Sequence, residues 1–408
     1  MLSTAALAGS ERPCQGPRRR SCPSSPMMPK TPCGSTDRGG RATTRSISAP
    51  RCRKRSIPGS IAAPCLLEAI TLPAGVSVVR AMGILRHGGV QELRHLELEK
   101  PEPGVGEVRV RVVCSAMNPA DIRAREPSPA RRIPRSFPLV TGYDVAGEVD
   151  AIGPGVSDLQ IGDPVHGSPD LLRQGAHAEY VIVDHRRLRK IPSGWSWEMA
   201  AALPLAGVTA LECLERARQT VAAERVLIHA GAGGVGHLQI QLARAMGLEV
   251  WTTAGRDESV ALCSQLGARR VIDYRHASFV AACREALPPL RIIFDNVGGA
   301  CFEDSLEAIG PMGVLVSIVP TPSQQIAERL FLKAATVTHH VMGAATFTGI
   351  DPDAQGLALQ RLVTLAESRA VAPHVSAVYR VRDLARAHEH LERGRTLGKV
   401  VIRVADGW

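Results

Sequence analysis

The spacing of apolar residues over 81–204 is that of short strands. Over residues 107–113 three valines alternate with two arginines, which is the period of a half-buried strand. Turns containing glycine and proline recur at 101–107, 152–158 and 161–167. Short strands with frequent turns predict a small β-barrel or sandwich in this part of the chain.

From about Arg225 the pattern changes to apolar runs that alternate with helical segments. Residues 225–230 hold a short apolar run without alternation, as in a strand buried on both faces, and 235–247 carry apolar residues at helical spacing, Ala245 among them. We expect further strands at 248–254, 270–274, 291–297 and 312–319, and helices at 257–268, 278–287 and 302–309. Asp257 is the expected cap of the helix that it begins. This alternation predicts a parallel, doubly wound sheet, and a mixed segment after about residue 340 ends on a strand at 397–404.

A glycine-rich loop lies between the first strand and the first helix of this part. Residues 231–236 match G-x-G-x-x-G at Gly231, Gly233 and Gly236, and they include Gly234 and Val235. The first glycine permits a tight turn, the second lets the backbone approach a pyrophosphate, and the third lets the helix pack on the strand. In this strand–turn–helix setting the motif predicts a dinucleotide site.

The end of the next predicted strand favours NADPH over NADH. NAD enzymes place an acidic residue about 20 residues beyond the loop, where it holds a ribose hydroxyl. Residues 253–256 contain no carboxylate, and Arg256 could pair with a 2′-phosphate. The alternative is that Arg256 is a solvated loop residue.

The net charge of +10 comes from the first 80 residues alone. They hold 13 basic and 3 acidic residues, which leaves 36 of each in residues 81–408. The same segment has 10 of the 29 prolines, 5 of the 10 cysteines and no Phe, Tyr or Trp. We therefore expect a disordered leader over 1–80, because so few large apolar side chains cannot offset the entropy of ordering.

Two explanations of the leader carry equal weight. Its arginine-rich, serine-rich and acid-poor composition fits a mitochondrial or plastid transit peptide; alternatively, translation begins at Met82 and the protein is cytoplasmic. Nucleic-acid binding is not expected, because no aromatic residues are interleaved with the basic ones.

No apolar run is long enough for a membrane span, and the chain contains no C-x-x-C pair that would suggest a zinc module. The five cysteines of the body are expected to be buried free thiols.

Seven motifs in the body together resemble one known family. They are NPADIRAR (118–125), FPLVTGYDVAGEV (137–149), QGAHAEYV (174–181), AAALPLAGVTAL (200–211), VLIHAGAGGVG (226–236), FDNVGG (294–299) and LGKVVI (397–402). The body resembles a zinc-independent medium-chain dehydrogenase/reductase of the quinone oxidoreductase-like, zeta-crystallin type.

The resemblance implies an α/β fold in which a GroES-like, β-rich catalytic domain contains an inserted Rossmann domain. The implied boundaries are 81–204 for the first part of the catalytic domain, 205–340 for the Rossmann domain and 341–408 for the return to the catalytic domain. It also implies an active site between the two domains and a homodimer.

No metal site is expected. Zinc-dependent relatives carry a cysteine ligand where this chain has Asn118 and a histidine ligand where it has Tyr143. They also carry a lobe of closely spaced cysteines, whereas this chain has none between Cys114 and Cys213. Amide and phenol groups are poor zinc ligands.

The resemblance implies that Asn118 and Tyr143 face the hydride acceptor. Asn118 could donate an amide hydrogen bond, or could only form the turn before Pro119; Tyr143 could donate its phenol proton, stack, or pack as a wall. Asp121 is expected to order the loop rather than to transfer protons. Arg123 stands near a position where the family often has an aromatic residue, which leaves the acceptor preference open.

The remaining implied residues contact the cofactor. Thr209 and Asn296 are implied on the nicotinamide side, Tyr274 near the 2′-phosphate and Lys399 near the cofactor cleft. A helix-interior hydroxyl is the alternative for Thr209, and a core aromatic for Tyr274. His229 is expected to be a packed histidine rather than a base.

The expected function is NADPH-dependent hydride transfer to a quinone or an α,β-unsaturated carbonyl without zinc. A reductase of enoyl thioesters or biosynthetic enones is one alternative. A non-catalytic NADPH-binding protein is the other.

Overall fold

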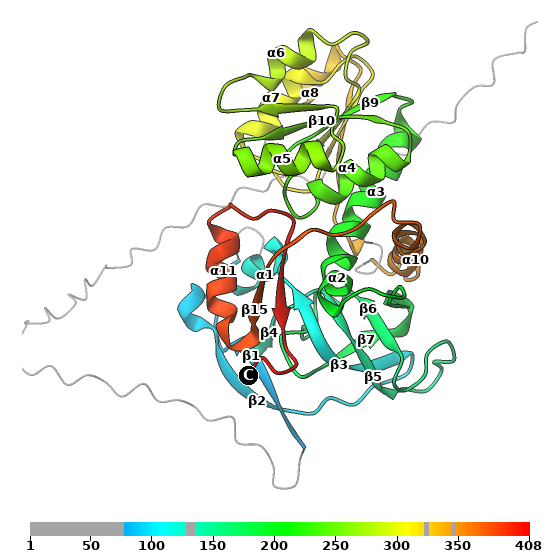
Figure 1. Ribbon diagram of the computed structural model, residues 1–408, viewed down its shortest axis with the longest axis vertical. Helices are drawn as coiled ribbons and strands as arrows, with labels where there is room; N and C mark the ends of the chain where they lie inside the picture. The colour runs from blue at the N-terminus through cyan, green and yellow to red at the C-terminus, as the bar shows by residue number, and fades with distance from the viewer. Residues whose placement is uncertain (1–76, 128–134, 322–325, 345–347) are drawn as a thin grey trace, which may run out of the picture. The chain divides into compact units, whose positions relative to one another are not determined.

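The computed structural model describes residues 77–127, 135–321, 326–344 and 348–408 (Figure 1). They all belong to one compact unit, Leu67–Trp408. Nearly all of the expected leader, with its five cysteines, lies outside the described residues. Strand β1 (Val78–Ile84) nevertheless begins inside the expected leader, and its residues from Val78 onward pair with β2 (Arg94–Glu99). A chain that began at Met82 would lack the first half of this strand.

A seven-stranded sheet combines strands from both ends of the described chain. Its order is β15-β16-β3-β5-β6-β8, with β7 paired to β3. The bounds are β3 (Glu107–Ala116), β5 (Val145–Ile152), β6 (Pro164–Gly167), β7 (Tyr180–Asp184), β8 (Leu188–Lys190), β15 (Val375–Arg380) and β16 (Lys399–Arg403). A smaller sheet has the order β2-β1-β4, where β4 is Leu139–Val140. Because β16 lies antiparallel to β3, the C-terminal segment returns to the first β-rich part.

The alternating strand expected at 107–113 is the start of β3. The three valines are buried as expected, and Arg111 is exposed. Arg109, however, is only 8% exposed, and its Nε donates to Asp150 Oδ2 at 2.6 Å. This arginine is buried because an acidic partner on the neighbouring strand compensates its charge.

The second large sheet is parallel, with the order β11-β10-β9-β12-β13-β14. Its strands are β9 (Arg225–Ile228), β10 (Glu249–Ala254), β11 (Arg270–Asp273), β12 (Ile292–Asp295), β13 (Val314–Ser317) and β14 (Thr336–His339). Its helices include α4 (Gly236–Ala245), α5 (Asp257–Gln265), α6 (Phe279–Arg284), α7 (Ala300–Ala308) and α8 (Ile326–Phe331).

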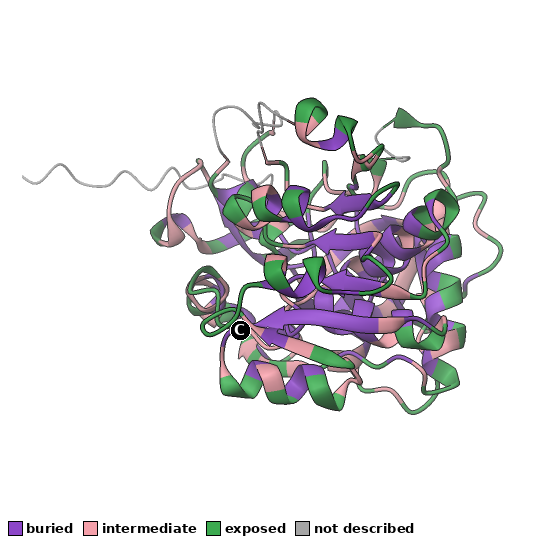
Figure 2. Ribbon diagram, turned by 90° about the horizontal axis from the view of Figure 1, so that it is seen from above, coloured by how far each residue is buried: buried purple, intermediate pink, exposed green. Residues whose placement is uncertain are grey.

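Two apolar clusters cover the two faces of this sheet. One joins its strands to α4, α5 and α3 (Pro204–Thr220); the other joins them to α6, α7 and α8. Figure 1 shows α4 and α5 on one side of these strands and α6, α7 and α8 on the other. The central strands of both large sheets are largely buried, whereas the edge strands β14 and β15 contain no buried residue and the helices have exposed outer faces (Figure 2). The expected strand–helix alternation and the doubly wound sheet are confirmed.

The other α-helices used below are α1 (Pro119–Arg125), α2 (Trp197–Ala202), α10 (Ala354–Glu367) and α11 (Leu384–Glu392).

Two local expectations were wrong. The residue that caps α5 is Arg256, and Asp257 is the first residue inside the helix. Ala245, expected on the apolar face of α4, is exposed.

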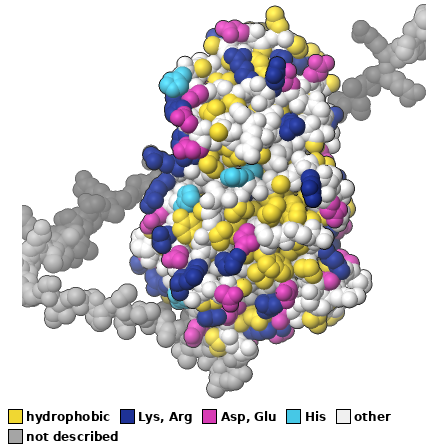
Figure 3. Space-filling model, in the orientation of Figure 1, with side chains coloured by type: hydrophobic (Ala, Val, Ile, Leu, Met, Phe, Trp, Pro, Cys, Tyr) yellow, Lys and Arg dark blue, Asp and Glu magenta, His cyan; other side chains and the backbone are white. Residues whose placement is uncertain are grey.

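Charges of both signs are interspersed on the face in Figure 3, in keeping with the neutral balance of residues 81–408. No helix among the described residues has the length and apolar character needed to cross a membrane. Four of the five body cysteines are buried and Cys301 is partly buried; all five are free thiols.

Candidate functional site

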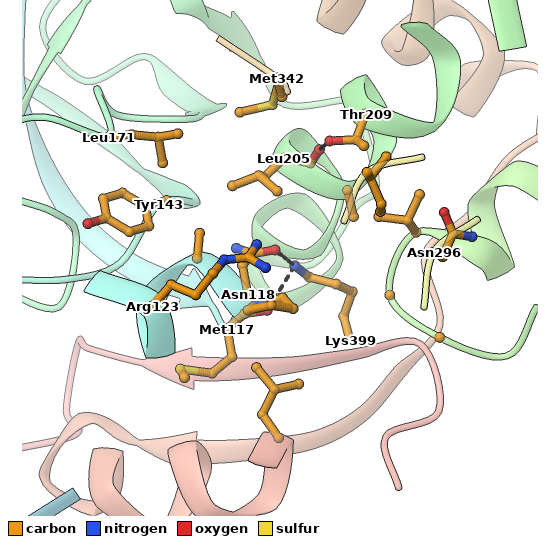
Figure 4. A pocket seen from close by; sticks show the side chains of 18 of the residues that line it. Met117, Asn118, Arg123, Tyr143, Leu171, Leu205, Thr209, Asn296, Met342 and Lys399 are labelled. Carbon is orange, nitrogen blue, oxygen red and sulfur yellow. Dashed lines mark hydrogen bonds between the residues drawn. The ribbon is translucent and has the colours of Figure 1, made fainter. Parts of the chain in front are cut away.

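A cavity of about 540 Å³ is lined by residues from the β-rich part and from the parallel sheet (Figure 4). The predicted site residues that line it are Asn118, Tyr143, Thr209, Gly233, Gly234, Val235, Gly236, Asn296 and Lys399. Asp121, Gly231, Arg256 and Tyr274 are not among the lining residues. The structure therefore brings together the expected acceptor residues and most of the expected cofactor residues.

Two glycines of the loop are required by the fold itself. A Cβ at Gly231 would overlap the Thr252 side chain, and one at Gly236 would overlap the carbonyl oxygen of Ala230. Gly236 therefore serves the close helix–strand packing expected of it. Gly231 serves packing as well, because the residue with a left-handed backbone in this turn is Ala230, with φ of 52°.

Gly233 and Gly234 have a different environment. The nearest atoms to a Cβ at Gly234 would be 3.6 Å away, which is an ordinary contact, and a Cβ at Gly233 would approach only Ala230 O, at 3.2 Å. Both residues line the cavity directly before the start of α4. The space in front of them, next to the backbone N–H groups of a helix N-terminus, fits the pyrophosphate of a dinucleotide.

Asn296 follows β12 and borders the cavity with one open acceptor. Its Nδ2 donates to His229 O at 2.9 Å and to Gln239 Oε1 at 2.7 Å. Its Oδ1 is buried without a hydrogen-bond partner in the described part of the chain, so it can accept from a ligand. Thr209 also lines the cavity, but its hydroxyl donates to Leu205 O of its own helix at 2.7 Å.

His229 is buried and held through both ring nitrogens. Nδ1 lies 3.2 Å from Thr253 Oγ1, and Nε2 lies 3.0 Å from Ser305 Oγ. Burial lowers the pKa of this histidine to about 4. It is a packed residue, as expected.

Arg256 and Tyr274 lie together beyond the carboxyl end of β10. The Tyr274 ring covers Gly255, since a Cβ there would overlap the ring, and the side chain remains 63% exposed. Arg256 is half-buried, and its Nη2 donates to Arg395 O at 2.8 Å. A guanidinium and a phenol therefore stand at the strand end where NAD enzymes carry an acid.

A buried ion pair lies at the edge of the cavity. Lys399 Nζ donates to Asp144 Oδ2 at 3.1 Å, to Asn118 Oδ1 at 2.6 Å and to Met117 O at 3.0 Å. Lys399, Asp144 and Asn118 are at most 3% exposed. All three ammonium hydrogens are used, so the side chain compensates the buried carboxylate rather than presenting a free charge.

Asn118 is tied into the same cluster through both ends of its amide. Its Nδ2 donates to Asp144 Oδ2 at 2.8 Å and to Ala116 O at 3.2 Å, while Oδ1 accepts from Lys399. These neighbours fix the orientation of the amide, because lysine can only donate and a carboxylate can only accept. In this conformation both amide hydrogens are engaged within the protein.

Asp144 is the site residue that sequence reasoning missed. Besides the cluster above, its Oδ1 accepts from the backbone N–H of Leu205 at 2.7 Å, at the start of α3. Asp144 is the next residue after Tyr143, within the motif at 137–149. Its position directly after a predicted site residue is a signal that could have pointed to Asp144. The sequence does not show its hydrogen-bond partners, however, because they come from distant parts of the chain.

Asp121 is fully buried below the cavity and joins two loops. Its Oδ2 accepts from the N–H of Asn118 at 2.8 Å, and Oδ1 accepts from the N–H of Gly142 at 2.7 Å. Burial raises the pKa of Asp121 to about 7, although these two hydrogen bonds act in the opposite direction. The arrangement agrees with a loop-ordering role.

Tyr143 forms part of the cavity wall. The residue is fully buried, and burial raises the pKa of its phenol above the usual range. Its hydroxyl is buried without a geometrically acceptable hydrogen-bond partner among the described residues, and Figure 4 shows it directed away from Asn118 and Lys399. Tyr143 thus borders the cavity without directing its hydroxyl at the Asn118–Lys399 side.

Within the described residues, no three His, Cys, Asp or Glu side chains are grouped so that they could hold a metal ion. His340, beside the cavity, lies with Nε2 3.0 Å from Glu212 Oε2. A third ligand does not accompany this pair in the described part of the chain.

Comparison with known proteins agrees with this architecture. Residues 104–193 match the alcohol dehydrogenase GroES-like domain, and residues 266–402 match a family described as zinc-binding dehydrogenase. A quinone oxidoreductase from Pseudomonas aeruginosa is 30% identical over 78% of this chain and 97% of its own length. A zinc-type alcohol dehydrogenase-like protein from Staphylococcus aureus is 33% identical over 76% and 94%.

A mycobacterial protein solved in complex with NADPH has a similar structure. Its TM-score is 0.72 at 30% identity, and the match covers 80% of this chain and all of that chain. Fold, site and relatives together define an oxidoreductase with a nicotinamide cofactor and small-molecule substrates. The chain belongs to the medium-chain dehydrogenase/reductases, and within them to the quinone oxidoreductase-like group.

The two pairs of glycines predict opposite effects of substitution. Gly233→Val should abolish NADPH binding with little loss of stability, because its side chain would occupy ligand space. Gly231→Val should instead destabilise the fold by about 1–3 kcal/mol or more through overpacking. Thermal unfolding and NADPH titration of both variants would measure this. Equal loss of stability in both variants would contradict the division of these glycines into a packing pair and a ligand-binding pair.

The buried ion pair between Lys399 and Asp144 predicts a large loss of folding stability when only one of the two partners is removed. Lys399→Met should lower the free energy of unfolding by about 3–5 kcal/mol, because it leaves the Asp144 carboxylate buried without a counter-charge. The double variant Lys399→Met/Asp144→Asn should be more stable than the single one. Denaturant unfolding would test both, and a single variant within about 1 kcal/mol of wild type would refute the argument.

Proposed function

We propose that this protein is an NADPH-dependent reductase of quinones or α,β-unsaturated carbonyl compounds that works without zinc. The observation that carries the proposal is that one cavity is lined both by the glycine loop with Asn296 and by the proposed acceptor residues Asn118 and Tyr143. A nicotinamide bound along the loop would end beside the space available to an acceptor.

The chain supplies a complete set of groups for the cofactor. Gly233, Gly234 and Val235 would hold the pyrophosphate through backbone N–H groups, and the open Oδ1 of Asn296 would accept a hydrogen bond near the nicotinamide. Arg256 and Tyr274 would bind the 2′-phosphate, which supports NADPH as the preferred form. When bound, NADPH supplies the hydride.

The side chains at the acceptor end have positioning roles. The Lys399–Asp144–Asn118 cluster holds the start of α1 and the start of β16 in fixed positions at the cavity edge. Tyr143, Leu171 and Leu205 provide an apolar wall that excludes water from the reacting carbon. Tyr143 is protonated at neutral pH like any ordinary tyrosine, and burial raises the pKa of its phenol further.

Zinc independence is supported by the residues themselves. Asn118 and Tyr143 stand where zinc-dependent relatives carry ligands, and the amide of Asn118 is fully engaged by Lys399, Asp144 and Ala116. Neither side chain is a good zinc ligand.

The proposed activity predicts turnover in the absence of added metal. Full-length protein with NADPH should reduce 9,10-phenanthrenequinone or 2-cyclohexenone in buffer treated with a chelator, as measured by the loss of NADPH absorbance. Tight NADPH binding without turnover of either acceptor would favour the non-catalytic alternative. Stoichiometric zinc whose removal abolishes turnover would contradict the zinc-free mechanism.

The position of Arg256 predicts the choice of cofactor. Arg256→Gln should raise KM for NADPH about ten- to 100-fold and raise KM for NADH much less, because only NADPH loses a charge-assisted hydrogen bond. Arg361→Gln, at an exposed position of α10 and outside the cavity lining, removes an equal charge and serves as the control. A parallel change in KM for both cofactors would show that Arg256 does not contact the 2′-phosphate.

A further inference from the structure

A buried histidine beside the cavity has no assigned role in binding the cofactor or the acceptor. His340 directly follows β14, lines the cavity and is 9% exposed. Its Nε2 lies 3.0 Å from Oε2 of Glu212 on α3, whose side chain is 22% exposed. Glu212 does not line the cavity. The histidine therefore stands between the cavity and a carboxylate behind it.

Contacts between α3 and β14 hold this pair in place. Arg216 lies one turn beyond Glu212, and its Nη1 donates to Thr338 Oγ1 at 3.1 Å. Thr338 precedes His340 by two residues. Residues four apart share one face of a helix, and residues two apart share one face of an extended chain, so both contacts join the same two faces. The backbone N–H of His340 also donates to Ser317 O at 2.9 Å.

One nitrogen of the His340 ring is open to a ligand. Nε2 is buried, and it approaches Glu212 at the distance of an ion pair but without the geometry of a hydrogen bond. Nδ1 also forms no hydrogen bond within the described residues, but it is not enclosed in the same way. Because the residue lines the cavity, Nδ1 is the nitrogen that a ligand there can reach.

Glu212 is the charged group that faces the ring from α3. The guanidinium of Arg216 is directed at Thr338 instead. Among the cavity-lining residues, the ammonium of Lys399 is compensated by Asp144. A carboxylate at 3.0 Å stabilises an imidazolium by direct attraction, so the site can hold a protonated histidine beside the cavity.

His340 stands at the edge of the parallel sheet where the nicotinamide is expected. The glycine loop follows β9, Asn296 follows β12, Ile318 follows β13 and His340 follows β14, and these strands are neighbours in this order. A dinucleotide binds across the carboxyl ends of such strands. Its 2′-phosphate is expected at β10, on the other side of β9, so its nicotinamide would extend past Asn296 toward His340. Thr209, one turn before Glu212 on α3, also lines the cavity.

We propose that His340 donates the proton that completes the reduction and that Glu212 is its counter-charge. This proposal rests on the proposed reductase activity. Hydride addition to the β-carbon of an enone breaks the C=C π bond and leaves the negative charge on the carbonyl oxygen. The imidazolium gives its Nδ1 proton to that oxygen, so that an O–H bond forms as the N–H bond breaks. The enol then rearranges to the saturated ketone, and water returns a proton to Nδ1 after the product leaves.

His340→Gln tests the proposal against the neighbouring variant His339→Gln. His339 is exposed, stacks on Phe302 and does not line the cavity, so its replacement is a matched control. With 2-cyclohexenone at neutral pH, we expect kcat to fall about 100-fold in His340→Gln and to remain within about twofold of wild type in His339→Gln. The Kd for NADPH, measured by its fluorescence, should stay within about twofold in both variants.

A second variant leaves the histidine in place and removes only the charge behind it. Glu212→Gln should lower kcat about tenfold without changing the Kd for NADPH, because an amide does not stabilise the imidazolium as a carboxylate does. Thermal unfolding of each variant shows whether it is folded under the conditions of the assay.

The pH profile of kcat separates proton donation from a structural role. A donor acts only in its protonated form, so kcat of wild type should be highest at low pH and fall as the pH rises through the titration of one group. In His340→Gln the low kcat should no longer fall over the same pH range. His339→Gln should keep the wild-type profile.

A binding measurement does not depend on turnover. The phenolate of 4-nitrophenol mimics the oxyanion, and its absorbance reports its binding to the full-length chain loaded with NADP⁺. We expect its Kd at neutral pH to rise about tenfold in His340→Gln, because a charge-assisted hydrogen bond is lost, and to stay unchanged in His339→Gln.

The outcomes separate this proposal from the proposed function. If wild type reduces the enone and His340→Gln keeps its kcat and its pH profile, the proton-donor role is overturned and the reductase activity stands. A lower kcat with the wild-type pH profile and unchanged phenolate binding makes His340 a structural residue and also overturns the role. Weaker phenolate binding in His340→Gln, without turnover of any enone or quinone by wild type, supports a donor at His340 and contradicts the reductase activity.

Discussion

The buried contact between Lys399 and Asp144 is the interaction on which the site geometry depends. It joins the first residue of β16 to the residue before β5, and Asn118 adds the segment between β3 and α1. Asp144 also accepts from Leu205 N, at the start of α3. Because a buried charge is tolerated only with a partner and satisfied hydrogen bonds, these four segments have very few alternative arrangements.

The same region connects the acceptor side to the nucleotide side. Gly398, next to Lys399, donates its N–H to Ala232 O in the glycine loop at 2.7 Å. The loop thus has two sets of residues with separate tasks: Gly231 and Gly236 permit close packing of the chain on itself, whereas Gly233 and Gly234 leave room for a ligand. One sequence motif therefore encodes both a folding requirement and a binding surface.

Much of the nucleotide-binding sheet could be predicted from the sequence, because apolar periodicity and turn residues are local properties. One error arose where a tertiary partner outweighed the local pattern. Arg109 is buried in a strand because Asp150 on the neighbouring strand compensates its charge. The one-residue difference at the start of α5, where Arg256 rather than Asp257 is the cap, has no such tertiary partner among the described contacts. The domain boundaries expected at 204 and 340 remain predictions, although the pairing of β16 with β3 shows that both ends of the body contribute to one sheet.

By itself, the sequence determined the class of protein, the glycine loop and the missing acid beyond β10, since each is a short pattern whose meaning does not depend on distant residues. Only the tertiary structure decided what the acceptor residues do. Lys399 and Asn118 are 281 residues apart in the sequence. Their contact fixes the orientation of the Asn118 amide, which the motif alone left free to donate a hydrogen bond to an acceptor.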